Sequence, residues 1–442
     1  MRIIRNVEEG RKQLLSRRPL EIEDLPMDIR ETIFRTFGQE LSPDEVVRRI
    51  IRDLREDGDN ALRYYNTRFD GAPGGEPLEV THDEVRAAYD EVDSKVVDAL
   101  NFAAERIRVY HEQQLRGAQF DFQSNGMGQM IRAIETVGVY VPGTHAPLPS
   151  TALMCAIPAR AAGVERLYLA SPVLPNGSVP PSKLIAADIA GVDGIFKAGG
   201  AQGIAAFAYG TESIPKVDKI CGPGGLFVTL AKKYVFGDVG IDAIYGPTET
   251  MVVADESADA DMVAADLLAQ AEHDPLASPI LLTSSHHLAD QVAAAVERRL
   301  ATMEREKIAR AAMDTRGGCI LVGDLDQAIT LANDYAPEHL CLLVENPTAY
   351  AMKVRNAGGL FLGEGSPEAF GDYVAGPSHT MPTGGSARWS GPLGVADFLK
   401  PMAVVNVPEE LVEELGHVAK VIAEAEGLGG HASAAELRIR GR

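Results

Sequence analysis

The sequence of 442 residues predicts an α/β protein, in which parallel sheets are covered by helices on both faces. Short apolar runs alternate with helical patterns over most of the chain. The first of these runs begin at Val137, Arg166, Gly194 and Lys219, about 30 residues apart, which is the length of a strand–helix–strand unit. This alternation favours parallel strands joined by crossover helices.

Composition excludes several classes of protein. Asp and Glu number 63 against 42 Lys and Arg, so the net charge of −21 would repel nucleic acid and anionic membranes. A hydrophobic share of 45% excludes intrinsic disorder. The four cysteines form no C-x-x-C pair, and no signal peptide or membrane span is recognisable. We therefore expect a cytoplasmic protein that binds neither nucleic acid nor membrane.

The first part of the chain is predicted to be helical. Residues 1–30 form an N-terminal arm, and residues 31–136 form a helical region that we expect to pack with the second α/β unit. Ser42 is a favourable N-cap and is followed by Pro43 and two acids in the first turn. Apolar residues then recur at helical spacing as far as Leu54.

Two Rossmann-like, doubly wound units follow, at residues 137–247 and 248–390. Strands are predicted at 137–141, 166–170, 194–198 and 219–221 in the first unit, and at 250–254, 278–283, 319–322, 339–344 and 360–362 in the second. Residues 391–442 are predicted to form a separate helical tail, with a helix over 408–425 and a glycine-rich hinge after it.

Three glycine-rich segments follow predicted strands of the first unit, at residues 140–143, 199–202 and 222–225. Ligands of parallel α/β sheets bind beyond the carboxyl ends of the strands, where helix N-termini offer free N–H groups to a pyrophosphate. A dinucleotide is therefore a candidate ligand. None of the segments matches G-x-G-x-x-G, and the alternative is that they are tight turns without a ligand.

A candidate metal site begins near the end of a predicted helix, where Gln270 and His273 share one face. Asp372, His379 and His431 are further candidate residues. Nitrogen and oxygen ligands without a thiolate suit zinc in an open, substrate-accepting site. The alternative is that His273 is a surface residue stabilised by the helix dipole.

An acid and an imidazole are adjacent at Glu338 and His339, at the start of a predicted strand. Histidine titrates near neutral pH and can shuttle protons, while a neighbouring carboxylate can orient water. The alternative is that Glu338 faces solvent and His339 packs at a strand edge. The remaining histidines are predicted to be solvated: His82, His111, His286, His287 and His417.

Taken together, seven segments resemble the histidinol dehydrogenase family. They are VGVYVPG at residues 137–143, PLPSTALM at 147–154, AYGTESIPKVDKI at 208–220, FGDVGIDAIYGPTE at 236–249, AADLLAQAEHDP at 264–275, APEHL at 336–340 and GDYVAGPSHTMPTGGSAR at 371–388. Their combination in one order is specific to this superfamily.

The resemblance implies four ligands to one zinc ion per subunit: Gln270, His273, Asp372 and, from the partner subunit of a homodimer, His431. It implies that Glu338 and His339 are the catalytic acid/base pair. The implied substrate site contains Glu338 and the four zinc ligands, together with Ser150, Thr248, His379 and Glu426. The residues implied to bind NAD are Tyr140, Gln202 and Gly225.

The implied reaction is the oxidation of L-histidinol through L-histidinal to L-histidine, the last steps of histidine biosynthesis, with two NAD as hydride acceptors. His339 is suited to take the hydroxyl protons, and Glu338 to activate the water that attacks the aldehyde. The family architecture is an intertwined homodimer. In it the unit at residues 248–390 is the catalytic one, and the tail contributes to the partner's site.

The sequence departs from the family pattern at three places. Thr248 replaces the serine of GPSE, Gly225 replaces the asparagine of GPGN, and Thr144 with His145 interrupts YVPGG. Because Thr248 adds a methyl group near the substrate, a paralogue that oxidises another small polar alcohol, such as a sulfonated propanediol, is an alternative. More distant alternatives are a zinc hydrolase, which the glycine segments disfavour, and a binding protein without turnover.

Overall fold

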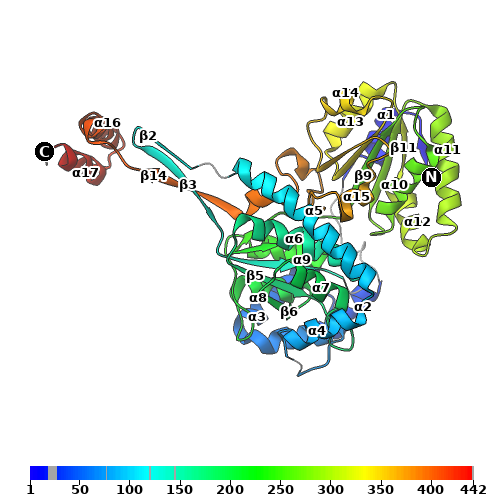
Figure 1. The fold of residues 1–442 in the computed structure, drawn as a ribbon, viewed down its shortest axis with the longest axis horizontal. Coiled ribbons are helices and arrows are strands. Elements are labelled where there is room, and N and C mark those ends of the chain that lie inside the picture. Colours follow the sequence, from blue (N-terminus) through cyan, green and yellow to red (C-terminus); the bar gives the residue numbers. More distant parts are fainter. Residues whose placement is uncertain (18–26, 76, 119–120, 144–145, 441–442) are drawn as a thin grey trace.

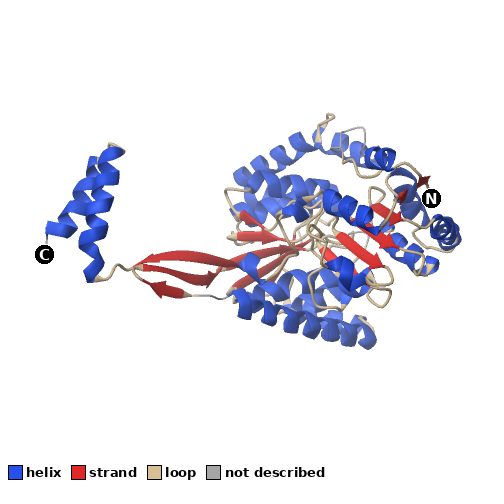
Figure 2. Cartoon of the chain, turned by 90° about the horizontal axis from the view of Figure 1, so that it is seen from above, coloured by secondary structure: helices blue, strands red, loops and turns tan. Residues whose placement is uncertain are grey.

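The computed structural model describes residues 1–17, 27–75, 77–118, 121–143 and 146–440, so that Thr144 and His145 lie outside the described residues. Two sheets packed between helices form the body of the molecule. A narrow ribbon of strands leaves this body and carries a pair of helices at its far end (Figures 1 and 2).

The first sheet has five parallel strands in the order β6-β5-β4-β7-β8. The strands are β4 (Thr136–Tyr140), β5 (Arg166–Ser171), β6 (Gly194–Lys197), β7 (Lys219–Cys221) and β8 (Gly240–Ile241). The direction in which the chain adds strands reverses between β4 and β7. In doubly wound sheets, ligands bind in the crevice beyond the carboxyl ends of the strands at such a reversal.

Helices of the first unit cover both faces of this sheet: α6 (Pro149–Ala162), α7 (Pro181–Ile189), α8 (Gly200–Tyr209) and α9 (Leu226–Val235). The N-terminal helices α2 (Met27–Phe37), α3 (Pro43–Tyr65), α4 (His82–Glu91) and α5 (Ser94–Ala118) precede them in the chain. Among these, α3 packs on α8 and α9, α4 packs on α7, and α5 packs on α6 and α7.

The prediction that the region 31–136 packs with the second α/β unit was therefore wrong. The apolar face of α3, which includes Val47, Ile50 and Leu62, shares one core with α8 of the first unit. His111 on α5 is also buried rather than solvated, with Nδ1 2.8 Å from the carbonyl oxygen of Ile107.

The second sheet has six parallel strands in the order β1-β11-β10-β9-β12-β13. They are β1 (Ile3–Ile4), β9 (Glu249–Ala254), β10 (Ser278–Thr283), β11 (Gly318–Leu321), β12 (His339–Leu343) and β13 (Gly359–Leu362). One face packs on α10 (Ala260–Ala271), α11 (His286–Leu300) and α12 (Glu306–Thr315); the other packs on α13 (Leu325–Tyr335), α14 (Pro347–Ala351) and residues after α1 (Val7–Gln13). The N-terminal arm thus contributes an edge strand to the second unit.

The ribbon is an antiparallel sheet in which β3 (Met127–Ala133) lies between β2 (Phe122–Ser124) and β14 (Leu399–Val405). It leads to α16 (Val412–Ala425) and α17 (Gly429–Arg440), which pack against each other well away from the body (Figure 2). Among the described residues, no helix is both long and apolar enough to cross a membrane.

Candidate active site

A cavity of about 470 Å³ lies between the two units. The first unit contributes segments that follow the carboxyl ends of β4 and β7, including Pro142 and Gly225, together with Ser150 on α6. The second unit instead contributes the amino ends of its strands, at the start of β9 and β12. The second-unit lining includes Thr248, Gln270, His273, Glu338, His339, Asp372 and His379.

Glu338 and His339 lie in the part of the cavity wall that the second unit contributes, where β12 begins beside β9. One carboxylate oxygen of Glu338, Oε2, accepts hydrogen bonds from Thr248 Oγ1 at 2.8 Å and from the backbone N–H of Glu249 at 3.1 Å. His339 Nδ1 lies 3.2 Å from the carbonyl oxygen of Glu249, to which it donates. Both side chains are buried, so Glu338 does not face solvent.

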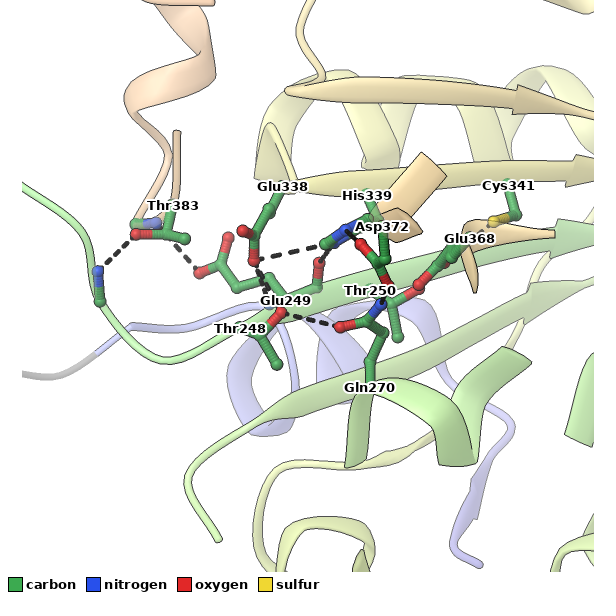
Figure 3. Close-up of polar contacts among 12 residues, drawn as sticks. Thr248, Glu249, Thr250, Gln270, Glu338, His339, Cys341, Glu368, Asp372 and Thr383 are labelled. Carbon is green, nitrogen blue, oxygen red and sulfur yellow. Dashed lines mark hydrogen bonds and ion pairs between the residues drawn. The ribbon is translucent and has the colours of Figure 1, made fainter. Parts of the chain in front are cut away.

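The other ring nitrogen of His339, Nε2, points towards Asp372 and lies 3.6 Å from its Oδ1 (Figure 3). It is buried, and it makes no hydrogen bond to the described part of the chain. A histidine that donates through Nδ1 to a carbonyl oxygen has its basic lone pair at Nε2. The structure therefore presents the proton-accepting atom of His339 within the site.

The candidate metal ligands come from the ends of two helices, α10 and α15 (Glu368–Tyr373). Gln270 Nε2 donates to Asp372 Oδ2 at 3.1 Å, and Gln270 Oε1 lies 3.1 Å from Thr248 Oγ1, whose single hydroxyl proton is nearer to Glu338. His273, one turn beyond Gln270, lines the same cavity. Gln270, His273 and Asp372, which the resemblance implies as metal ligands, thus line one cavity.

The side chain of His379 contacts both units, beside Asp372 of the second and Thr151 of the first. Its Nδ1 lies 2.8 Å from the carbonyl oxygen of Asp372, and its Nε2 lies 3.2 Å from the hydroxyl of Thr151 on α6. Sequence analysis selected Ser150 and missed Thr151. The one available signal was the position of Thr151 in the same PLPSTALM segment.

Burial and close charges shift the pKa values of the site. Burial raises the pKa of Glu338 to about 7. Burial lowers the pKa of His339, and the nearby carboxylates of Glu338, Glu368 and Asp372 raise it above its ordinary value, so that they favour the imidazolium that forms when His339 accepts a proton. Burial also lowers the pKa of His273, which favours the neutral imidazole, the form that binds metal ions.

The donor set fits a zinc ion held in an open site. Gln270, His273 and Asp372 offer oxygen, nitrogen and oxygen, which are ligand types that zinc accepts, and all three line the cavity. Within the described residues, no three His, Cys, Asp or Glu side chains gather closely enough to hold a metal ion by themselves.

Four of the predicted site residues do not line this cavity. Glu426 and His431 lie on the distant helix pair, where both are exposed. Tyr140 and Gln202 are buried at the carboxyl edge of the first sheet: the hydroxyl of Tyr140 accepts from the N–H of Gly200 at 2.9 Å, and the amide of Gln202 donates to Asn66 Oδ1 at 3.3 Å.

Comparison with known proteins decides the family, because the model of the histidinol dehydrogenase family matches residues 36–439. The chain belongs to the histidinol dehydrogenase family. The histidinol dehydrogenase of Dehalococcoides mccartyi is 46% identical over 99% of this chain and 100% of its own length. That of Thermus thermophilus is 48% identical over 89% of this chain and 94% of its own.

A crystal structure of histidinol dehydrogenase from Elizabethkingia anophelis has the same fold, with a TM-score of 0.89 at 34% identity over 99% of this chain and 97% of that one. Membership of the histidinol dehydrogenase family confirms the resemblance found in the sequence motifs. It also confirms that the chain is an enzyme of the oxidoreductase class and that its fold is α/β with two parallel sheets.

Proposed function

We propose that this enzyme oxidises L-histidinol through L-histidinal to L-histidine, with two NAD used in succession and one zinc ion per subunit. The observation that carries the proposal is the Glu338–His339 pair, which faces a cavity shared with Gln270, His273 and Asp372. Across this cavity lies the glycine segment at residues 222–225. Alcohol oxidation needs a base, a means of orienting the substrate and a hydride acceptor, and this cavity has residues suited to each task.

In the first oxidation, His339 takes the hydroxyl proton of the alcohol through Nε2. The carbonyl oxygen of Glu249 holds the opposite ring nitrogen and so fixes the orientation of the imidazole. Loss of this proton, with transfer of a hydride from the carbinol carbon to the nicotinamide, converts the alcohol to the aldehyde. One NAD is reduced and one proton is released to solvent.

In the second oxidation, Glu338 activates a water molecule that adds to the aldehyde carbon to give a geminal diol. Its pKa, raised to about 7 by burial, makes the carboxylate a better base than an exposed glutamate. Thr248 and the N–H of Glu249 hold Oε2, and we assign the other oxygen, Oε1, to the water. His339 then takes a proton from the diol, and the second NAD, when bound, would accept the hydride from the same carbon, which yields the carboxylic acid.

We assign zinc to Gln270, His273, Asp372 and His431 of the partner subunit; when bound, it would orient the imidazole and amine of the substrate. Ser150, Thr248 and His379 lie around the same cavity and are proposed to contact the substrate, together with Glu426 from the tail. The added methyl group of Thr248 does not prevent its hydroxyl from donating to Glu338 beside Gln270.

We assign NAD to the carboxyl edge of the first sheet at the reversal between β4 and β7, with Tyr140, Gln202 and Gly225 as binding residues. Two features support this assignment. Gly222 has φ +112°, and a Cβ there would lie 2.2 Å from the carbonyl oxygen of Tyr140, so that only glycine lets the segment approach β4 this closely. Gly225 then begins α9 at the cavity wall.

We also propose a homodimer in which the tail of each chain reaches the site of the other. The tail is displaced from its own body, and its helices expose large apolar side chains: Leu415, Val418, Val421, Ile422, Leu428 and Leu437. Exposed apolar surface of this extent indicates a protein partner.

The four free cysteines, all buried, agree with a reducing, cytoplasmic compartment.

The proposed function is tested by incubating the zinc-loaded enzyme with NAD and a panel of histidinol, histidinal and short polar diols. We expect two NADH for each histidinol consumed, one for each histidinal, and histidine as the product by mass spectrometry. NADH formation from a diol but not from histidinol would assign the chain to a different alcohol. A flat trace with every substrate would remove the dehydrogenase proposal.

A further inference from the structure

The peptide group of Glu249 holds both members of the acid/base pair. Its N–H donates to Glu338 Oε2 at 3.1 Å, and its carbonyl oxygen accepts from His339 Nδ1 at 3.2 Å. Glu249 is the first residue of β9, where the strand ladder begins. Because strand ends are more prone to local opening than strand centres, a contact through the side chain of Glu249 would add to the strand pairing that holds this peptide.

Arg17, in the N-terminal arm, supplies such a contact through the side chain of Glu249. Its Nε donates to Oε1 at 2.7 Å and its Nη2 to Oε2 at 2.8 Å, which makes the pair bidentate. The third nitrogen, Nη1, donates to the carbonyl oxygen of Tyr335 at 2.8 Å, and the guanidinium lies over the Tyr335 ring, 3.8 Å from its centre.

The Glu249 side of the pair is shielded from solvent, since the side chain of Glu249 is 7% exposed, whereas that of Arg17 is 30% exposed. The same carboxylate accepts from the N–H of Gly384 at 3.3 Å, in the segment that follows His379. Neither Arg17 nor Glu249 lines the cavity, so neither is placed to touch the substrate. Their effect on the reaction must pass through Glu338 and His339.

We propose that Arg17 is a positioning residue: by clamping the carboxylate of Glu249, it fixes the peptide that orients both Glu338 and His339. The inference rests on the proposed function for its catalytic consequence, but the clamp itself is a property of the protein without ligands. Misplacement of catalytic groups by about 1 Å can cost about 100-fold in rate. Because Arg17 contacts no proposed ligand of zinc or NAD, its loss should affect kcat more than KM.

The experiment compares Arg17→Met with Arg11→Met. Arg11 lies in the same arm and pairs with Asp334 at 2.9 Å, next to Tyr335, but it does not contact Glu249. We expect Arg17→Met to lower kcat about 10- to 100-fold, with KM for alcohol and NAD within about twofold and the same zinc content. Arg11→Met should keep the kcat of the wild type. Equal kcat values in the two folded variants would overturn the proposal.

Two further variants cover the case in which Arg17→Met does not fold. Arg17→Lys keeps the charge without the planar fork, and Glu249→Gln keeps the peptide and one acceptor oxygen. Each should lower kcat by less than Arg17→Met does. In the double variant Arg17→Lys/Glu249→Gln, the fold loss of kcat should be smaller than the product of the two single losses, because both substitutions disturb one interaction. Wild-type kcat in both single variants would contradict the clamp.

A readout without turnover separates this inference from the proposed function. Amide hydrogen exchange in the segment 246–254, measured on protein without metal or NAD, should be faster in Arg17→Lys than in Arg11→Met or the wild type. If the wild type oxidises no alcohol but the exchange difference is present, the proposed function fails and the clamp stands. If the wild type is active and the exchange is unchanged, the clamp fails alone.

Discussion

At the scale of single residues, the site separates two proton-transfer tasks between adjacent side chains. Glu338 and His339 follow one another in the chain, yet the strand pairing turns them to different partners: Thr248 for the acid and Asp372 for the imidazole. The shared anchor is the peptide of Glu249. Two groups held on one peptide can serve successive steps without a rearrangement of the site.

This division predicts different effects for two substitutions. His339→Asn should lower the rates of both alcohol and aldehyde oxidation by about 10²- to 10⁴-fold, because both steps need its proton transfer. Glu338→Gln should slow aldehyde oxidation more than alcohol oxidation, because only that step activates water. The two steps are measured separately with histidinol and histidinal as substrates, and zinc content is the control. Equal losses in both steps for both variants would contradict the assigned roles.

Gly225 allows a second test at this scale. It is the N-cap of α9 with an ordinary φ of −68°, and a Cβ there would meet no atom within 4 Å. Gly225→Asn should therefore fold with an unlowered melting temperature, since Asn is also a favoured N-cap. If NAD binds here, the added amide should lower the KM for NAD, whereas Gly225→Ala should not. An equal KM for NAD in both variants would place the dinucleotide elsewhere.

At the scale of elements, the first sheet is held to the loop after β4 by a buried lysine. Lys183 on α7 is fully buried, and its Nζ donates to the carbonyl oxygen of Pro142 at 2.9 Å and to Ser171 Oγ at 2.7 Å. Burial lowers the pKa of Lys183 to about 7. The packing of α7, β5 and this loop is thus linked to pH.

The contribution of Lys183 to the free energy of unfolding increases with pH. Between about pH 7 and the ordinary lysine value of about 10.4, the unfolded chain binds more protons at Lys183 than the folded chain does, so stability from this group rises with pH. This contribution of Lys183 to stability is lost as the pH falls towards 7. We expect the melting temperature of the wild type minus that of Lys183→Met to increase from pH 7 to pH 9. A difference that is flat or decreases over this range would contradict the assignment.

Most strands of the two sheets were predictable because they are buried apolar runs, whereas the two-residue strands β1 and β8 were not predicted. Every predicted strand is observed with ends within one residue of the prediction, as for β10 at Ser278–Thr283. The ribbon of β2, β3 and β14 was not predicted, because most of its residues are half-buried or exposed and β14 pairs with a strand far away in the sequence. The helical region was predicted as helical but assigned to the wrong sheet, since periodicity identifies an apolar face and not its partner.

The candidate site was predictable only in part. Glu338 and His339 are adjacent, and Gln270 and His273 share a helix face, so local spacing made them candidates, with a purely structural role as the alternative for each pair. Their meeting with Asp372 depends on the packing of α10 against α15, which local spacing does not report, so Asp372 was one of several candidates until the family motif was considered. The anchoring role of Glu249 and its pairing with Arg17 join positions 232 residues apart, and no local pattern reports such a contact.

At the scale of the whole molecule, the two units face each other with opposite edges. The first sheet presents the carboxyl ends of its strands, as expected for a nucleotide site. The second presents the amino ends of β9 and β12, so its chemistry lies at the edge that the general rule for α/β sheets does not predict. This arrangement brings a hydride-acceptor site and an acid/base pair to one cavity, while the tail is left to reach a second copy.

The proposed exchange of tails predicts complementation between inactive variants. His431→Ala and Gln270→Ala should each lose activity as homodimers. A heterodimer of the two would contain one site with both substitutions and one site with neither, so mixing after partial unfolding should restore activity. Verified heterodimers without recovered activity would show that His431 does not serve the site of its partner.

The proposed mechanism depends most on a zinc ion that is shared between two subunits. Anomalous diffraction at the zinc edge measures the position of this ion directly. For crystals of the zinc-loaded enzyme, we predict one peak per chain at about 2.0–2.2 Å from Gln270, His273, Asp372 and His431 of the partner subunit. A peak at another position, or a dimer in which these four side chains lie too far apart to bind one ion, would contradict the account.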